Sequence, residues 1–118
     1  MKRIFEIDFH RRAQDLASDA ALAIDRDPEG ARILYCHAAT LEMEALKRAD
    51  VARSRARSVL AVSCASLMVK AARLGDDEHA RLARAFAKAQ LQGNHEPRFV
   101  EQLQAAADEA YKLMTRSS

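Results

Sequence analysis

Glu42 is the side chain in this 118-residue sequence whose position has the clearest chemical meaning. On a helical wheel it falls inside an apolar stripe formed by Tyr35, Ala38, Leu41, Ala45 and Leu46. Packing of that stripe would bury the carboxylate, and a buried charge needs a partner. An antiparallel turn near Asp50 would bring Arg57 roughly level with Glu42. We therefore predict an ion pair between Glu42 and Arg57, or between Glu42 and Arg53.

The predicted ion pair has two chemical interpretations. As a structural pair it fixes how two helices pack, because removing either partner would leave a buried charge. As a binding site it leaves one partner free to hold the carboxylate or phosphate of a ligand. A third alternative is that the side chains extend into solvent. The candidate binding residues of the chain are Glu42, Arg53, Arg57, Tyr35 and Arg48.

Basic side chains surround the predicted turn near residue 50; they are Lys47, Arg48, Arg53, Arg55 and Arg57. Such a cluster can bind an acidic peptide or nucleic-acid phosphates. No aromatic residues are interleaved for base stacking, and 19 basic against 17 acidic side chains leave a net charge of only +2. We therefore interpret the cluster as a solvated helix end and expect no nucleic-acid partner.

The histidines of the chain, His10, His37, His79 and His95, include no pair at the i, i+4 spacing that presents two ligands to a metal. We predict no metal and no cofactor. Arg32 and His37 do form an R-x4-H motif. It resembles the ribonuclease motif of the small all-helical HEPN domains, in which arginine and histidine act together on RNA phosphate. An RNA-cleaving, toxin-type helical protein that uses Arg32 and His37 is therefore the alternative function.

Composition indicates the fold that positions these residues. The sequence contains 25 alanines but only 3 glycines and 2 prolines. Alanine is the strongest helix former and lets two helix backbones approach closely, whereas a β-sandwich or barrel needs more turn residues. A chain of this length forms one core. We therefore predict an all-α fold in a single domain spanning residues 1–118.

Helical periodicity and stop signals divide the chain into about five antiparallel helices. The first carries apolar residues from Phe9 to Ile24, is capped by Asp8 after a short extended arm, and stops at Asp27 and Pro28. The remaining helices are predicted over about Glu29–Arg48, Ala52–Arg73, from Asp77 to Gln92 and from Pro97 to Met114. The third is apolar on several sides, so we expect it at the centre of the domain.

The turn after the third helix is predicted to be tight. Gly75 fits the left-handed position that follows many helix ends, because glycine has no Cβ to clash there. Asp76 and Asp77 then supply a cap and a favourable charge for the next helix.

Two stretches resemble degenerate tetratricopeptide repeats. Ala21 to Pro28, followed by Ala31 to Tyr35, is similar to the junction between consecutive repeats. The spacing of Leu67, Ala71, Gly75-Asp76, Ala80 and Ala87 is similar to the inner contacts, turn and small residues of one repeat. The resemblance implies helical hairpins in a right-handed superhelix or a compact bundle. It also implies a groove that accepts a partner peptide or helix, without catalysis.

We therefore expect a non-enzymatic protein-interaction module with a protein or peptide partner. Its groove should be bordered by the second and third helices and lined by polar residues of the first helix of each hairpin. Self-association into a homo-oligomer is a further prediction, because so few hairpins leave exposed ends.

The sequence also carries signals about location. The longest uncharged run, Ser58 to Val69, is too short for a membrane span, which needs about 20 residues. Cys36 and Cys64 show no disulfide or metal-ligand spacing. We expect reduced thiols in a cytoplasmic protein with no membrane partner.

Overall fold

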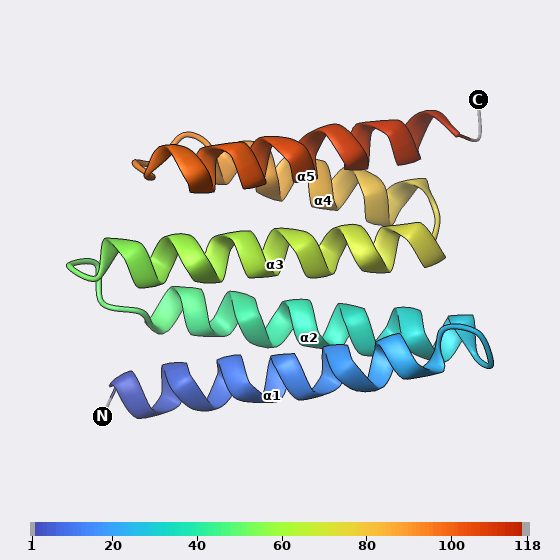
Figure 1. Ribbon diagram of the computed structural model, residues 1–118, viewed down its shortest axis with the longest axis horizontal. Helices are drawn as coiled ribbons and strands as arrows, with labels where there is room; N and C mark the ends of the chain where they lie inside the picture. Colours follow the sequence, from blue (N-terminus) through green and yellow to red (C-terminus); the bar gives the residue numbers. More distant parts are fainter. Residues whose placement is uncertain (1, 117–118) are drawn as a thin grey trace.

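The computed structural model describes the backbone of residues 2–116 and the side chains of residues 8–116. These residues form an all-α fold, as predicted, in which the chain runs up and down through successive helices (Figure 1). The helices are α1 (Lys2–Ala23), α2 (Pro28–Arg48), α3 (Ser54–Leu74), α4 (Asp77–Gln90) and α5 (Pro97–Thr115).

Two helices begin at aspartate caps. Asp27 accepts a hydrogen bond from Gly30 N at 2.9 Å, and Pro28 occupies the first turn of α2. A Cβ on Gly30 would lie 2.2 Å from Oδ2 of Asp27, so this cap needs glycine three residues later. Asp76 caps α4 in the same way by accepting from His79 N at 3.3 Å. The cap at Asp76 was predicted from the sequence, whereas Asp27 was predicted only as the stop of the preceding helix.

Two local predictions are wrong. The arm before Asp8 is not extended, because α1 already begins at Lys2. No proline or glycine interrupts this segment, and continuing the helix satisfies backbone groups that an arm would leave to water. Gly75 is not left-handed; its φ of −112° and ψ of −150° are extended. A Cβ there would lie 2.8 Å from His79 Nδ1, so close packing against the histidine ring requires glycine.

The prediction that the third helix is central is confirmed. α3 packs against α2 on one side and against both α4 and α5 on the other, while α1 packs on α2. Figure 1 shows α1 and the α4/α5 pair at opposite edges of the array, with α4 behind α5. The shortest dimension of 19 Å corresponds to about two helix diameters.

The core is built largely from small residues. Most of its fully buried positions are alanines, among them Ala38, Ala61, Ala65 and Ala83. Small side chains let neighbouring helix axes come close, and larger side chains then fill the spaces between the alanines. The largest fully buried side chains are Leu103, Glu42 and Cys64. A carboxylate is thus among the most enclosed groups of the protein.

Candidate functional site

Glu42 lies on α2 with none of its surface exposed, as its place in the apolar stripe predicts. His10 Nδ1 on α1 lies 2.8 Å from Oε1 and 2.9 Å from Oε2 of this carboxylate. Gln14, one turn further along α1, donates to Oε2 at 3.2 Å. Ser63 on α3 also donates to Oε2. Two neighbouring helices therefore supply three donor side chains to one buried carboxylate, and we call His10, Gln14, Glu42 and Ser63 the carboxylate network.

The predicted partner of Glu42 is wrong. Arg57 instead donates from Nη1 to the backbone oxygens of Leu46 at 3.2 Å and Ala49 at 3.1 Å, where it satisfies carbonyl groups at the end of α2. Arg53 is not the partner either; it is the N-cap residue that precedes α3. Only the second and third helices were considered as neighbours of the stripe, although α1 covers the same stripe from the other side.

The other predicted binding residues are not assembled around Glu42. Tyr35 is buried in the core between α1, α2 and α3. Arg48 lies 3.6 Å from Glu44 and places its guanidinium 5.2 Å from the centre of the Phe9 ring. Arg53 lines a separate, open hollow at the start of α3. The five predicted residues therefore do not form one site.

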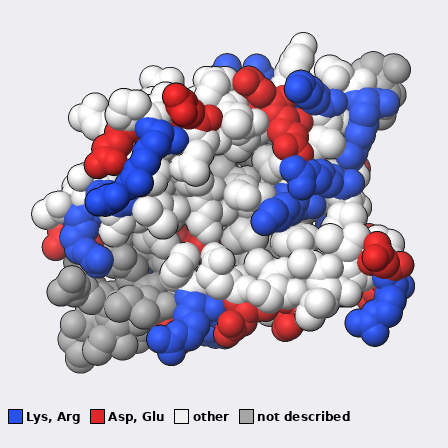
Figure 2. Space-filling view, viewed as in Figure 1, with Lys and Arg blue, Asp and Glu red and all other residues white. Residues whose placement is uncertain are grey.

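An open groove of about 480 Å³ lies beside the carboxylate network. It is lined from α1, α3 and α5 by His10, Gln14, Ala17, Val59, Val62, Ser63, Ser66, Leu67, Lys70, Phe99 and Gln102. We call this feature the α1/α3/α5 groove. Figure 2 shows a hollow in the middle of one face, with charged side chains of both signs along its rim. The groove is lined by the first helix of each hairpin, as expected, but not by α2, so its predicted border of the second and third helices is wrong.

The electrostatics of the groove are set by few charges. The lining residues include Lys70, and the described part of the chain offers its amine no ion-pair partner. His10 faces Glu42, and Arg73 is held by Glu109 in a second hollow that continues from the groove. The two hollows share Lys70, so this amine is the accessible positive charge between them.

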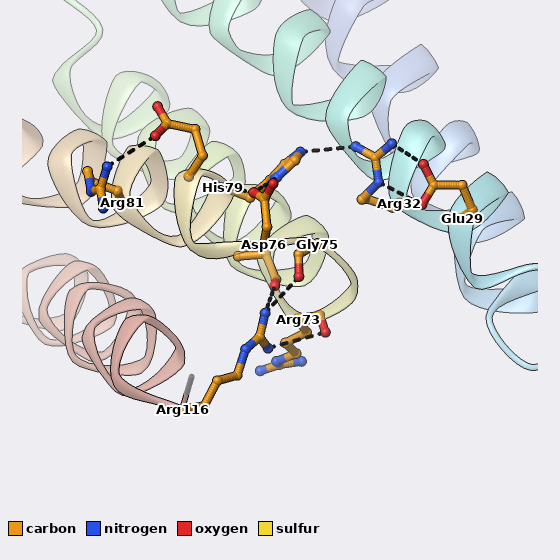
Figure 3. Close-up of polar contacts among 10 residues, drawn as sticks. Glu29, Arg32, Arg73, Gly75, Asp76, His79, Arg81 and Arg116 are labelled. Atoms are coloured by element: carbon orange, nitrogen blue, oxygen red, sulfur yellow. Dashed lines mark hydrogen bonds and ion pairs between the residues drawn. The ribbon is translucent and has the colours of Figure 1, made fainter. Parts of the chain in front are cut away.

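Arg32 takes part in a separate chain of polar contacts at the other end of the hairpins (Figure 3). Its guanidinium binds Glu29 on its own helix and lies 3.0 Å from His79 Nε2 on α4. The other ring nitrogen of His79 lies 2.8 Å from Asp76 Oδ1. His37, the predicted partner of Arg32, is exposed and is not part of this chain.

The charges of this second cluster perturb one another. The hydrogen bond from Arg32 holds the pKa of the Glu29 carboxyl below its usual value, and the pKa of Arg32 is raised in return. Hydrogen bonds from His79 likewise lower the pKa of Asp76. Glu78 in turn pairs with Arg81 at 3.2 Å, and Arg116 donates to the Gly75 oxygen beside Asp76 (Figure 3). Several arginines therefore accompany the carboxylates of this cluster.

The two thiols are free and differ in environment. Cys64 is fully buried, and its Sγ lies 3.5 Å from the backbone oxygen of Ala39. Burial, reinforced by the nearby Glu42 carboxylate, raises the pKa of Cys64 to about 12. Burial also raises the pKa of the half-buried Cys36. Neither thiol is activated as a nucleophile in this environment.

The sequence held a signal for the missed donors. His10 and Gln14 are one helical turn apart and flank Ala13, which is fully buried. Polar residues beside a buried position lie at the edge of the helix face that packs on the neighbouring helix. From there their side chains can reach a buried charge such as Glu42. A search for partners of Glu42 on the first helix would have found them.

Within residues 8–116, no group of three or more His, Cys, Asp and Glu side chains is placed to hold a metal ion. None of the described helices is both long and apolar enough to cross a membrane. No family model, curated protein or solved structure matches this chain. The resemblance to tetratricopeptide repeats therefore stays a prediction.

Proposed function

We propose that the chain is a non-catalytic protein-interaction module that holds a segment of a partner protein in the α1/α3/α5 groove. The observation that supports the proposal is the groove itself, which is open and mixes apolar with polar lining residues. Pockets of this composition combine apolar contact area with a few polar groups that fix orientation.

The lining residues indicate what the partner should carry. Val59, which is 44% exposed, and the buried Phe99 both line the groove, which favours an apolar side chain of the partner. Lys70 lies about three helical turns further along α3, roughly 16 Å away at 1.5 Å per residue. An extended or helical segment with one apolar anchor and one carboxylate at that separation fits both positions.

Site-specific photo-crosslinking in cells tests the proposal. A photoreactive amino acid at Ser66, inside the groove, should capture a defined partner, whereas one at Thr40, which is exposed on α2 outside the groove, should not. Lys70→Glu should weaken capture from position 66, because it reverses the accessible charge. Unchanged thermal stability of that variant serves as the control. The proposal would be overturned if positions 66 and 40 captured the same proteins and if Lys70→Glu left the amount captured unchanged.

Self-association is a second candidate function, favoured by large apolar side chains left in solvent. Leu22 is 76% exposed, Val51 81% and Leu82 53%. An interface between copies would gather such side chains into one contiguous apolar patch. Sedimentation at tens of micromolar should then show a dimer or larger species, and a monomer at that concentration would contradict it.

The HEPN-like alternative requires Arg32 and His37 to act together across two copies, because within one chain Arg32 binds Glu29 and His79. An RNase assay separates it from the proposals above. Wild type and His37→Ala should both give background cleavage if the chain is not a ribonuclease.

A further inference from the structure

One ring nitrogen of His10 faces the groove without a partner. The side chain is 39% exposed and lines the α1/α3/α5 groove. Nδ1 is committed to the Glu42 carboxylate, and among the described residues Nε2 has no hydrogen-bond partner. The ring is therefore fixed at one nitrogen and available at the other.

This arrangement makes Nε2 a nucleophile. A carboxylate that accepts from Nδ1–H fixes the tautomer in which the lone pair is on Nε2. When Nε2 attacks an electrophile, the imidazole becomes positively charged, and the carboxylate stabilises that charge. Glu42 is fully buried and receives two further donors, Gln14 and Ser63, so it cannot turn away from the ring.

The groove that His10 lines favours an anionic electrophile. The residues that line the groove include Lys70 but no aspartate or glutamate. Ser66 and Gln102 line the same part and can donate hydrogen bonds to oxygens of an incoming group. A phosphoryl group matches these features, because it carries negative charge and several strong acceptor oxygens.

We propose that His10 is a phosphoryl-accepting residue, held by Glu42 as a positioning residue and assisted by the Lys70 charge. The donor class is a phosphoramidate, in which phosphorus is bonded to nitrogen. The Nε2 lone pair forms a new N–P bond while the P–N bond of the donor breaks. The donor nitrogen leaves as an amine that takes up a proton, and the proton on Nδ1 stays in the hydrogen bond to Glu42. This inference does not depend on a protein partner.

The test uses the full-length chain and inorganic phosphoramidate, with 31P NMR and mass spectrometry as readouts. His10 should be phosphorylated faster than the exposed His37, and only at Nε2. Glu42→Gln should slow the phosphorylation of His10 by about tenfold, the lower end of the losses that follow removal of an outer carboxylate from a metal-binding histidine. His37→Asn is the matched control and should leave the rate at His10 unchanged.

Two further variants keep the result interpretable. His10→Asn retains an N–H donor for Glu42 while removing Nε2, so it should fold and lose the modification. Lys70→Gln removes a charge that has no ion-pair partner among the described residues, so it should slow the reaction without unfolding the chain. If Glu42→Gln does not fold, the ratio of the phosphorylation rates of His10 and His37 in the wild-type protein tests the proposal. Equal rates at the two histidines, or a mixture of Nδ1 and Nε2 products on His10, would overturn the proposal.

Discussion

Glu42 has an energetic cost that its neighbours offset. Removing a carboxylate from water costs several kcal/mol, and here the compensation is three donors from two other helices. An apolar residue of similar volume is often as stable or more stable at such a position. We therefore infer that Glu42 is kept for what it does to the exposed His10 ring rather than for stability.

The thiol of Cys64 makes stability depend on pH at the alkaline end. Its pKa rises from 9.0 to about 12 on folding, so between these values the native state holds a proton that the unfolded chain has lost. Its contribution is fully present below pH 9 and is lost as the pH rises towards 12. Urea unfolding should show a decline of up to about 1.4 kcal/mol per pH unit over this window. Cys64→Ala should lack this part of the decline, and identical pH profiles for the two proteins would contradict the assignment.

At the scale of elements, the starts of α2 and α4 could be predicted, whereas the start of α1 and the conformation at the end of α3 could not. Asp27-Pro28 and Asp76 are local signals, because the capping side chain and the helix it caps are adjacent in sequence. The conformation of Gly75 is set by the His79 ring one turn into the next helix, and glycine alone does not reveal it. The start of α1 was not predicted, because the alternation of apolar and polar residues before Asp8 resembles a short extended segment.

The end of α3 is held by a residue far away in sequence. Arg116, just after α5, donates to the backbone oxygens of Ala72 at 2.9 Å and Gly75 at 2.8 Å (Figure 3). These carbonyls belong to the last turn and cap of α3. Without Arg116 they would have to accept their hydrogen bonds from water. Arg116→Ala should lower the free energy of unfolding by about 1 kcal/mol. Arg116→Lys, which keeps the charge but loses the two-armed geometry, should recover part of it. No change in chemical denaturation for either variant would mean that the contact does not persist in solution.

At the scale of the whole molecule, the fold class and the central place of α3 could be predicted from periodicity, since both follow from which faces are apolar. The partner of Glu42 could not, because α1 and α3 both pack against α2 and either could supply a donor to the carboxylate. The groove is lined by the first helix of each hairpin, as the prediction had it, but it is not bordered by α2. The border depends on how the helices are ordered in space, which the sequence does not reveal. The polar residues that line the groove have no distinguishing pattern in the sequence. They lie together only because α1, α3 and α5 each contribute to the same face.

Leu103 packs α5 against α3 and α4. It is fully buried on α5 among Ala65 of α3 and Ala87 of α4, neither of which can expand to fill a space. Leu103→Ala should therefore destabilise the whole domain by about 2–5 kcal/mol. Thermal unfolding should remain a single transition at a lower temperature. A separate early transition would show instead that the α4/α5 pair unfolds independently of α1 and α2.

The most direct test of the account is a double-mutant cycle on the carboxylate network. His10→Ala should be strongly destabilising, because it removes a donor from the buried Glu42 carboxylate, whereas Glu42→Met should be nearly neutral. In the double variant the penalty of His10→Ala should largely vanish, giving a coupling energy of about 1–3 kcal/mol by urea unfolding. The parallel cycle of Glu42→Met with Arg57→Ala should give less than about 0.5 kcal/mol. Strong coupling of Glu42 to Arg57, with none to His10, would contradict the network and the groove-facing histidine that depends on it.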